Sequence, residues 1–423
     1  MHCKIVLLAV VLCAGLALPA HAQQDEGKNV AHPSSQAVET LTDERAPSQG
    51  PTAGMRTTAA RAAGWGSLET APAAVLGGAA AQTPSGGAET APRVALSGDV
   101  RVRYEHTTTD EGIPERDRGV VRARLNAQYS LSPNIAFGLR VATGDLTDPR
   151  TTDVTLGDFA HKLQANLDRV FVTVRGGPVA LTAGRMPNPF VASELAWDGD
   201  VNPHGVAGEL VLPKMGRLTP SVTSMLFVVD ELTAASDSTM LGTQVLGKLK
   251  LSPAATLTLG GAYYDYRMLT LSKSDVRGNL LTADGKRYLS DFDLVSVLGR
   301  LTYGRPETKW PVTFLTEYIV NRGTAGGAND DGFDVEIDVG RSRVKGAMRA
   351  RYGYMTADRD AVLNAFSHDN IPLASGYRMH TFGWDWYQRK DAFVNVTLYV
   401  FRDTLVPSSP YHARLRLNFT VEF

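Results

Sequence analysis

The chain has 423 residues, with 43 Lys+Arg against 44 Asp+Glu and a formal net charge of −1. This balance gives no general attraction to phosphates, which argues against a nucleic-acid-binding protein. Hydrophobic residues make up 43%, too few for a helical membrane protein, while the length suits several soluble domains or one large β architecture.

Residues 1–22 have the pattern of a bacterial export signal. Lys4 supplies a positive charge, residues 5–18 form an apolar core, and Ala20-His21-Ala22 offers a small-x-small cleavage site. We therefore expect cleavage after Ala22 and export from the cytoplasm. Cys3 and Cys13 are the two cysteines of the chain, so the mature protein would have no disulfide and no cysteine-ligated metal.

Residues 23–92 are rich in Ala, Gly, Thr, Ser, Pro and Gln. Such a composition offers too little bulky apolar surface to offset the entropy lost on ordering. We expect a low-complexity, disordered periplasmic leader. A segment that binds the cell wall or folds back as a plug is the alternative.

Residues 93–423 alternate between apolar and polar side chains. In the segment 99–104, Val100, Val102 and Tyr104 alternate with Arg101 and Arg103, which places one face of a strand in an apolar medium and the other in water. Aromatic residues gather near the expected strand ends, at Tyr303, Trp310, Tyr318, Trp384, Trp386, Tyr387, Tyr399 and Tyr411. This pattern favours an all-β fold, a transmembrane antiparallel β-barrel, over a soluble sandwich.

Short turns alternate with long loops along this region. Seven short turns are expected at 132–134, 176–178, 214–216, 252–253, 304–307, 341–343 and 389–391. Eight long loops are expected at 106–117, 144–166, 186–204, 230–239, 267–291, 322–332, 358–376 and 403–410. These connections predict about 16 strands, and a barrel of that size leaves a water-filled lumen.

The alternation also predicts which side chains point into the lumen. A basic wall is expected on adjacent strands, formed by Arg101, Arg103, Arg122, Arg124, Arg140, Arg169, Arg175, Arg414 and Arg416. For any single arginine, pairing with a nearby acid is the alternative. Asp334, Glu336 and Asp338 are expected to pair in part with Arg349 and Arg351.

The segment 186–204 carries the acids Glu194, Asp198 and Asp200 together with Trp197 and several prolines. If it folds into the lumen, it sets acids opposite the arginines. Opposed charges across a narrowing create a transverse field that filters solutes by charge. We treat the three acids as the candidate acidic side of a constriction.

The sequence offers no catalytic group, metal site or cofactor motif that we recognise. The histidines that follow the predicted cleavage site lie outside any known catalytic motif, which leaves an enzyme built on a barrel as a minor alternative. Asn329-Asp330-Asp331-Gly332 could loosely hold calcium, but a turn explains this run better.

Three motifs are similar to those of a known family. They are Gly138–Asp145 followed by Asp148-Pro149, Leu167–Val172 and, above all, Gly184–Phe190. They resemble the "putative porin" family of Gram-negative outer-membrane proteins, over roughly Val94 to Phe423. The resemblance implies an outer-membrane channel. Some relatives carry a helical segment before the barrel, which the Ala-, Gly- and Pro-rich leader does not resemble.

Together these observations predict a porin for passive diffusion of small hydrophilic solutes, with a charged constriction and a mild anion preference. The alternatives are a channel selective for phosphate or organic anions, and a plugged barrel that acts as an adhesin or structural protein. Expected partners are outer-membrane lipid and the barrel-assembly machinery, which would act on the C-terminal strand ending in Phe423. A homo-trimer is a candidate assembly.

Overall fold

The computed structural model describes residues 93–108, 115–157, 162–234, 236–271, 276–305, 307–325 and 330–423. The predicted export signal and leader, residues 1–92, lie outside the described residues. Within the described part, no helix is long and apolar enough to cross a membrane.

All regular elements of the described residues are β-strands. They are β1 (Val94–Thr107), β2 (Arg116–Ser132), β3 (Ile135–Thr143), β4 (Val154–Leu156), β5 (Ala165–Gly176), β6 (Val179–Arg185), β7 (His204–Val211), β8 (Leu218–Asp230), β9 (Ser238–Ser252), β10 (Ala255–Arg267), β11 (Phe292–Tyr303), β12 (Val312–Asn321), β13 (Asp331–Gly340), β14 (Met348–Ala357), β15 (Tyr377–Tyr387), β16 (Ala392–Asp403) and β17 (His412–Glu422).

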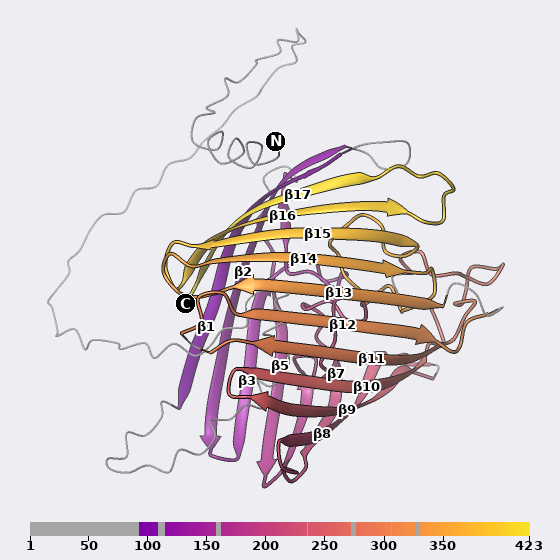
Figure 1. The fold of residues 1–423 in the computed structure, drawn as a ribbon. Helices are drawn as coiled ribbons and strands as arrows, with labels where there is room; N and C mark the ends of the chain where they lie inside the picture. The colour runs from indigo at the N-terminus through magenta and orange to yellow at the C-terminus, as the bar shows by residue number, and fades with distance from the viewer. Residues whose placement is uncertain are drawn as a thin grey trace, which may run out of the picture. The chain divides into compact units, whose positions relative to one another are not determined.

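These strands form one closed antiparallel barrel. Apart from β4, each strand pairs with the next one along the chain, and β17 returns to pair with β1, as Figure 1 shows by the yellow strands that lead back to the indigo ones. The short β4 pairs with β2 above the end of β3, while β3 pairs directly with β5. Sixteen strands therefore make the wall and β4 is an addition to it, which confirms the predicted fold class and strand number.

The connections follow the predicted pattern. The seven short turns fall where the sequence placed them, between β2 and β3, β5 and β6, β7 and β8, β9 and β10, β11 and β12, β13 and β14, and β15 and β16. The long connections all lie at the opposite end of the barrel. Only β4, inside the connection 144–164, was not expected.

The faces of the strands separate as the alternation requires. On β1, Val100 and Val102 are 49% and 52% exposed, whereas Arg101 and Arg103 are 2% and 3% exposed. Apolar side chains therefore face outward and charged side chains face the lumen, because lipid accepts the first and water or an ion partner must satisfy the second.

Two of the aromatic residues expected near the membrane interface lie elsewhere. Tyr303, Trp310, Tyr318, Trp386 and Tyr411 are exposed. Tyr387 and Tyr399 are instead buried, because they share the inward-facing positions of their strands. For these two residues the interfacial prediction was wrong.

Two long connections, 186–203 and 358–376, fold into the barrel and pack on its inner wall. Trp197 of the first stacks on Phe366 of the second with ring centroids 5.7 Å apart, and both contact Phe227 of β8. Backbone hydrogen bonds join the two segments, from Asp198 N to Phe366 O at 2.7 Å. The apolar core of the protein is therefore inside the barrel. Its buried residues include none from β1, β2, β3, β5 or β17, so the core does not fill the part of the lumen next to these five strands.

Candidate functional site

Three cavities adjoin one another in the open part of the lumen. The first, the loop-side cavity, has a volume of about 730 Å³ and is lined mainly by residues within 144–157, 162–164 and 369–374. The second, the arginine slot, has about 90 Å³. The third, the turn-side cavity, has about 60 Å³ and reaches Arg349, Asp385 and Phe393, close to the short turns.

The three cavities share lining residues, so they stand in series. Arg150, Thr151, Asp153 and Asp369 line both the loop-side cavity and the arginine slot. Glu194 and Asn370 line both the slot and the turn-side cavity. The cavities thus adjoin one another from the end with long connections to the end with short turns, and the slot and the turn-side cavity are far smaller than the loop-side cavity.

The nine arginines predicted to form a basic wall lie on five strands that are neighbours around the barrel. Seven of them are buried at inward-facing positions, namely Arg101, Arg103, Arg122, Arg124, Arg140, Arg414 and Arg416. Arg169 and Arg175 are partly buried on β5. Period-two alternation brings these side chains to one side of the lumen because their strands pair in register.

A β-bulge on β5 adds an acid to this wall. Opposite Arg140 and Val141, β5 carries one extra residue. Leu167 and Val170 are exposed on the outer face, whereas the two residues between them, Asp168 and Arg169, both bond to lumen groups. Asp168 pairs with Arg140. A bulge re-aims side chains in this way because it breaks the strict alternation of the strand.

Most of the wall is paired with acids that the sequence analysis did not single out. Asp99 accepts hydrogen bonds from Arg122 Nη2 and Arg124 Nε, both at 2.7 Å. Glu105 accepts one from Arg416 Nε at 2.7 Å. Asp99 and Glu105 lie on the same inward-facing side of β1 as Arg101 and Arg103. The period-two alternation of the sequence could therefore have identified both acids as lumen residues.

Asp153 has no such signal, because it lies in the connection between β3 and β5. It pairs with Arg101 and, at 2.7 Å, with Arg103 Nη1. Burial alone would raise the pKa of Asp153, but the charges of Arg101 and Arg103 outweigh it and lower the pKa. Its carboxylate therefore stays charged and reduces the positive charge of the wall.

The segment 186–203 brings its three acids to the slot in different ways. Asp200 reaches the wall, where it accepts from Arg124 Nη1 at 2.8 Å and from Thr152 Oγ1 at 2.9 Å. Asp198 accepts from the Asp200 backbone N–H at 2.8 Å. Glu194 accepts from Asn370 Nδ2 at 2.5 Å. All three line the slot, and Asp200 forms ion pairs with Arg124 and Arg140.

The charges of these acids differ because their neighbours differ. Burial would raise the pKa of Asp200, but Arg124, Arg122 and Arg140 lower it below its usual range. Burial raises the pKa of Asp198 well above its usual range, and the nearby Asp369 and Glu194 raise it further. The pKa of Glu194 is raised mainly by burial. Asp200 is therefore the acid of this segment that keeps its charge most firmly.

The connection 358–376 supplies two groups that sequence reasoning missed, Asp369 and Asn370. The side-chain oxygen of Asn370 accepts from Arg416 Nη1 at 2.9 Å and from the Tyr399 hydroxyl at 3.1 Å. Arg414 Nη1 donates to the Asn370 backbone oxygen at 3.0 Å. No sequence pattern distinguishes this asparagine, because only the fold of the connection places it inside the barrel.

The slot as a whole remains basic. Its lining includes eight arginines against five carboxylates. Arg169 directs its Nε to the Asn202 side-chain oxygen at 2.6 Å rather than to a carboxylate. An excess of positive charge in a narrow, partly desolvated passage attracts anions and repels cations.

The strands opposite the wall carry the acids expected on β13. Arg351 Nε donates to Asp338 at 2.8 Å, as the sequence suggested. Arg349 donates to Asp385 of the next strand at 2.5 Å instead of to β13. Asp334 and Glu336 line the turn-side cavity.

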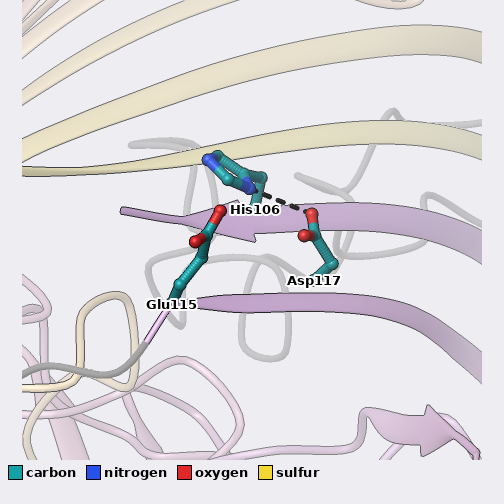
Figure 2. A group of neighbouring side chains, drawn as sticks. All are labelled: His106, Glu115 and Asp117. Atoms are coloured by element: carbon teal, nitrogen blue, oxygen red, sulfur yellow. Dashed lines mark hydrogen bonds and ion pairs between the residues drawn. The ribbon is translucent and has the colours of Figure 1, made fainter. Parts of the chain in front are cut away.

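Two groups among the described residues have side chains suited to a metal ion, and neither lines any of the three cavities. His106, Glu115 and Asp117 lie together at the ends of β1 and β2 (Figure 2), with His106 Nδ1 2.9 Å from Asp117 Oδ1. Asp330, Asp331 and Asp358 form the other group. Both lie apart from the route through the lumen.

Comparison with known proteins agrees with this geometry. Residues 109–289 match the Putative porin family. The match runs from the connection after β1 to the connection after β10, and it confirms the resemblance seen in the sequence motifs. No curated protein matches the chain.

Solved structures with a similar fold include OprB of Pseudomonas putida, with 12% identity, a TM-score of 0.54 and coverage of 78% of this chain and 94% of that one. An anion-selective porin from Comamonas acidovorans has 12% identity, a TM-score of 0.47 and coverage of 78% and 99%. OmpF of Salmonella typhi has 12% identity, a TM-score of 0.48 and coverage of 78% and 97%. At these identities the likeness to OprB shows the fold. The family match over residues 109–289 and the closed barrel together support an outer-membrane porin channel.

Proposed function

We propose that this porin lets small hydrophilic solutes diffuse passively through the arginine slot, with a mild preference for anions. The observation that carries the proposal is the series of three cavities, which share lining residues from one end of the barrel to the other. The preference is mild because five carboxylates offset much of the charge of the eight arginines in the slot.

The size of the slot supports a sieve for small solutes. The slot, with about 90 Å³, has only about an eighth of the volume of the loop-side cavity, with about 730 Å³. Trp197 and Phe366 hold the segments that narrow the lumen. A solute larger than a few heavy atoms across would have to displace these packed segments.

We further propose that the chain is exported with cleavage after Ala22, is assembled through its last strand ending in Phe423, and functions in outer-membrane lipid as a homo-trimer. The proposed activity is transport without a chemical step, so no residue is assigned a catalytic role. Seven of the nine wall arginines, all except Arg175 and Arg414, line the slot together with Arg150 and form the basic side of the constriction, and Glu194, Asp198 and Asp200 form the acidic side.

Single-channel recording of the refolded mature protein in a planar bilayer tests the proposal. Steady conductance is expected, and in a salt gradient the reversal potential should shift toward the equilibrium potential of the anion. A shift toward the equilibrium potential of the cation would still agree with a diffusion channel, but it would mean that the acids control the selectivity.

A barrel closed by its own connections is the second candidate. The observation in its favour is the apolar cluster of segments 186–203 and 358–376 inside the lumen. A folded protein that inserts into the bilayer and never conducts would support this candidate and exclude diffusion.

A further inference from the structure

The charges along the route through the lumen change sign between two adjoining cavities. The arginine slot has eight arginines against five carboxylates. The turn-side cavity has four carboxylates against two arginines, and Glu194 belongs to both linings. A solute that moves from one cavity to the next therefore meets a basic site and then an acidic one.

Asn370 lies at the boundary and shows the polarity of the two sides. Its side-chain oxygen faces Arg416 at 2.9 Å, and its side-chain nitrogen faces Glu194 at 2.5 Å. The guanidinium and the carboxylate are thus separated by one amide group. An α-amino acid carries its carboxylate and its ammonium group on one carbon, so it offers the same pair of functions, an acceptor for Arg416 and a donor for Glu194.

Asp334 has a carboxylate oxygen that could accept hydrogen bonds from a cation in the turn-side cavity. It is 1% exposed and lines the turn-side cavity. Among the residues that the structure describes, its Oδ2 atom has no hydrogen-bond partner. A buried carboxylate oxygen without a donor costs free energy, and an ammonium group that entered the cavity would supply donors to it.

From this arrangement we infer that the preferred solutes are small zwitterions of the amino-acid class. The carboxylate is held at the arginine slot and the ammonium group at Glu194 and Asp334. This inference rests on the proposed diffusion function, and it specifies the class of solute for the same route. A solute with both charges has a partner on each side, whereas an anion or a cation alone has only one.

Three solutes of similar size test the inference on the full mature protein in a planar bilayer at neutral pH. L-alanine carries both charges, lactate only the carboxylate, and L-alaninamide only the ammonium group. We expect L-alanine to interrupt the ion current at a concentration at least about tenfold lower than either of the others, because a hydrogen bond to a charged group commonly contributes a factor of this order. Equal concentrations for all three would overturn the inference and leave the porin intact.

Isosteric variants separate the two charges of the solute. Asp334→Asn should raise the interrupting concentration of L-alanine about tenfold and leave that of lactate unchanged, and Glu194→Gln should act in the same direction. Asp391→Asn is the matched control, since Asp391 lies at the same end of the barrel, pairs with Arg389 and lines none of the three cavities. Equal effects of Asp334→Asn on L-alanine and lactate would contradict the acidic subsite. A folded protein without any ion current would overturn both this inference and the proposed function.

Discussion

Asp200 offers the most direct test of how charge in the slot controls selectivity. It contacts Arg124 at 2.8 Å and lies 4.0 Å from Arg140, and its lowered pKa keeps it charged at neutral pH. Asp200→Asn keeps the shape of the side chain and removes one negative charge. We therefore expect a stronger preference for anions.

The size of the effect follows from Coulomb's law. One unit charge acting on an ion at about 7 Å in water contributes about 0.6 kcal/mol, close to RT, and salt at about 0.1 M reduces this by roughly half. Losing the charge favours an anion and disfavours a cation by the same amount. The ratio of anion to cation permeability should rise about three- to sevenfold on this basis.

The reversal potential in a KCl gradient measures this ratio directly. Asp284→Asn serves as the control, because Asp284 is exposed in the connection after β10 and lines none of the three cavities. Arg124→Gln should shift the potential in the opposite direction. If Asp200→Asn conducts normally with an unchanged reversal potential, ions do not pass through the slot and the reasoning is refuted.

Three further perturbations follow from the site. Lowering the pH from about 9 to about 5 should increase the anion preference. Because its pKa is raised, the Asp198 carboxylate takes up a proton and loses its negative charge at a pH above the usual aspartate range near 3.9. Asp198→Asn should reduce this effect of pH on the anion preference, and an effect of the same size in the variant would contradict its assignment to Asp198. Trp197→Ala should destabilise the packed segments by about 3–5 kcal/mol and give larger, noisier currents, whereas unchanged currents would mean that segment 186–203 does not set the opening. In Gly242→Ala the new Cβ would lie 2.7 Å from the ring of Phe190, which belongs to segment 186–203. The segment would have to shift, so we expect an altered conductance. Gly261→Ala is the control, because the nearest atom to its new Cβ is 3.4 Å away, and it should conduct as the parent protein does.

The wall of the barrel could be predicted because its rule is local. Lipid outside and water inside impose a period of two on every strand, so the outward Val100 and Val102 imply the inward Arg101 and Arg103. The short turns are equally local, and all seven lie at their expected positions. The bulge at Asp168 is the place where the rule breaks, since one inserted residue directs two consecutive side chains inward.

The filling of the lumen depends on contacts that no local pattern contains. Trp197 and Phe366 stack although 168 residues separate them in the chain. The positions of Asn370 and Asp369 follow from how two long connections pack together, not from the residues next to them. The sequence therefore identified the acids of segment 186–204 as candidates, but not the second connection that completes the slot.

The arginines at the seam between β1 and β17 have a consequence for engineering. Arg416 and Arg414 of β17 lie 2.7 Å and 3.5 Å from Glu105 of β1, and Arg103 of β1 donates to Asn418 of β17 at 2.8 Å. These bonds join the two ends of the sheet across more than 300 residues of chain. Changing them to alter selectivity would also weaken the step in biogenesis that closes the cylinder. Redesign of solute preference should therefore begin on β2, β3 and β5, where charge can be altered without loosening the join.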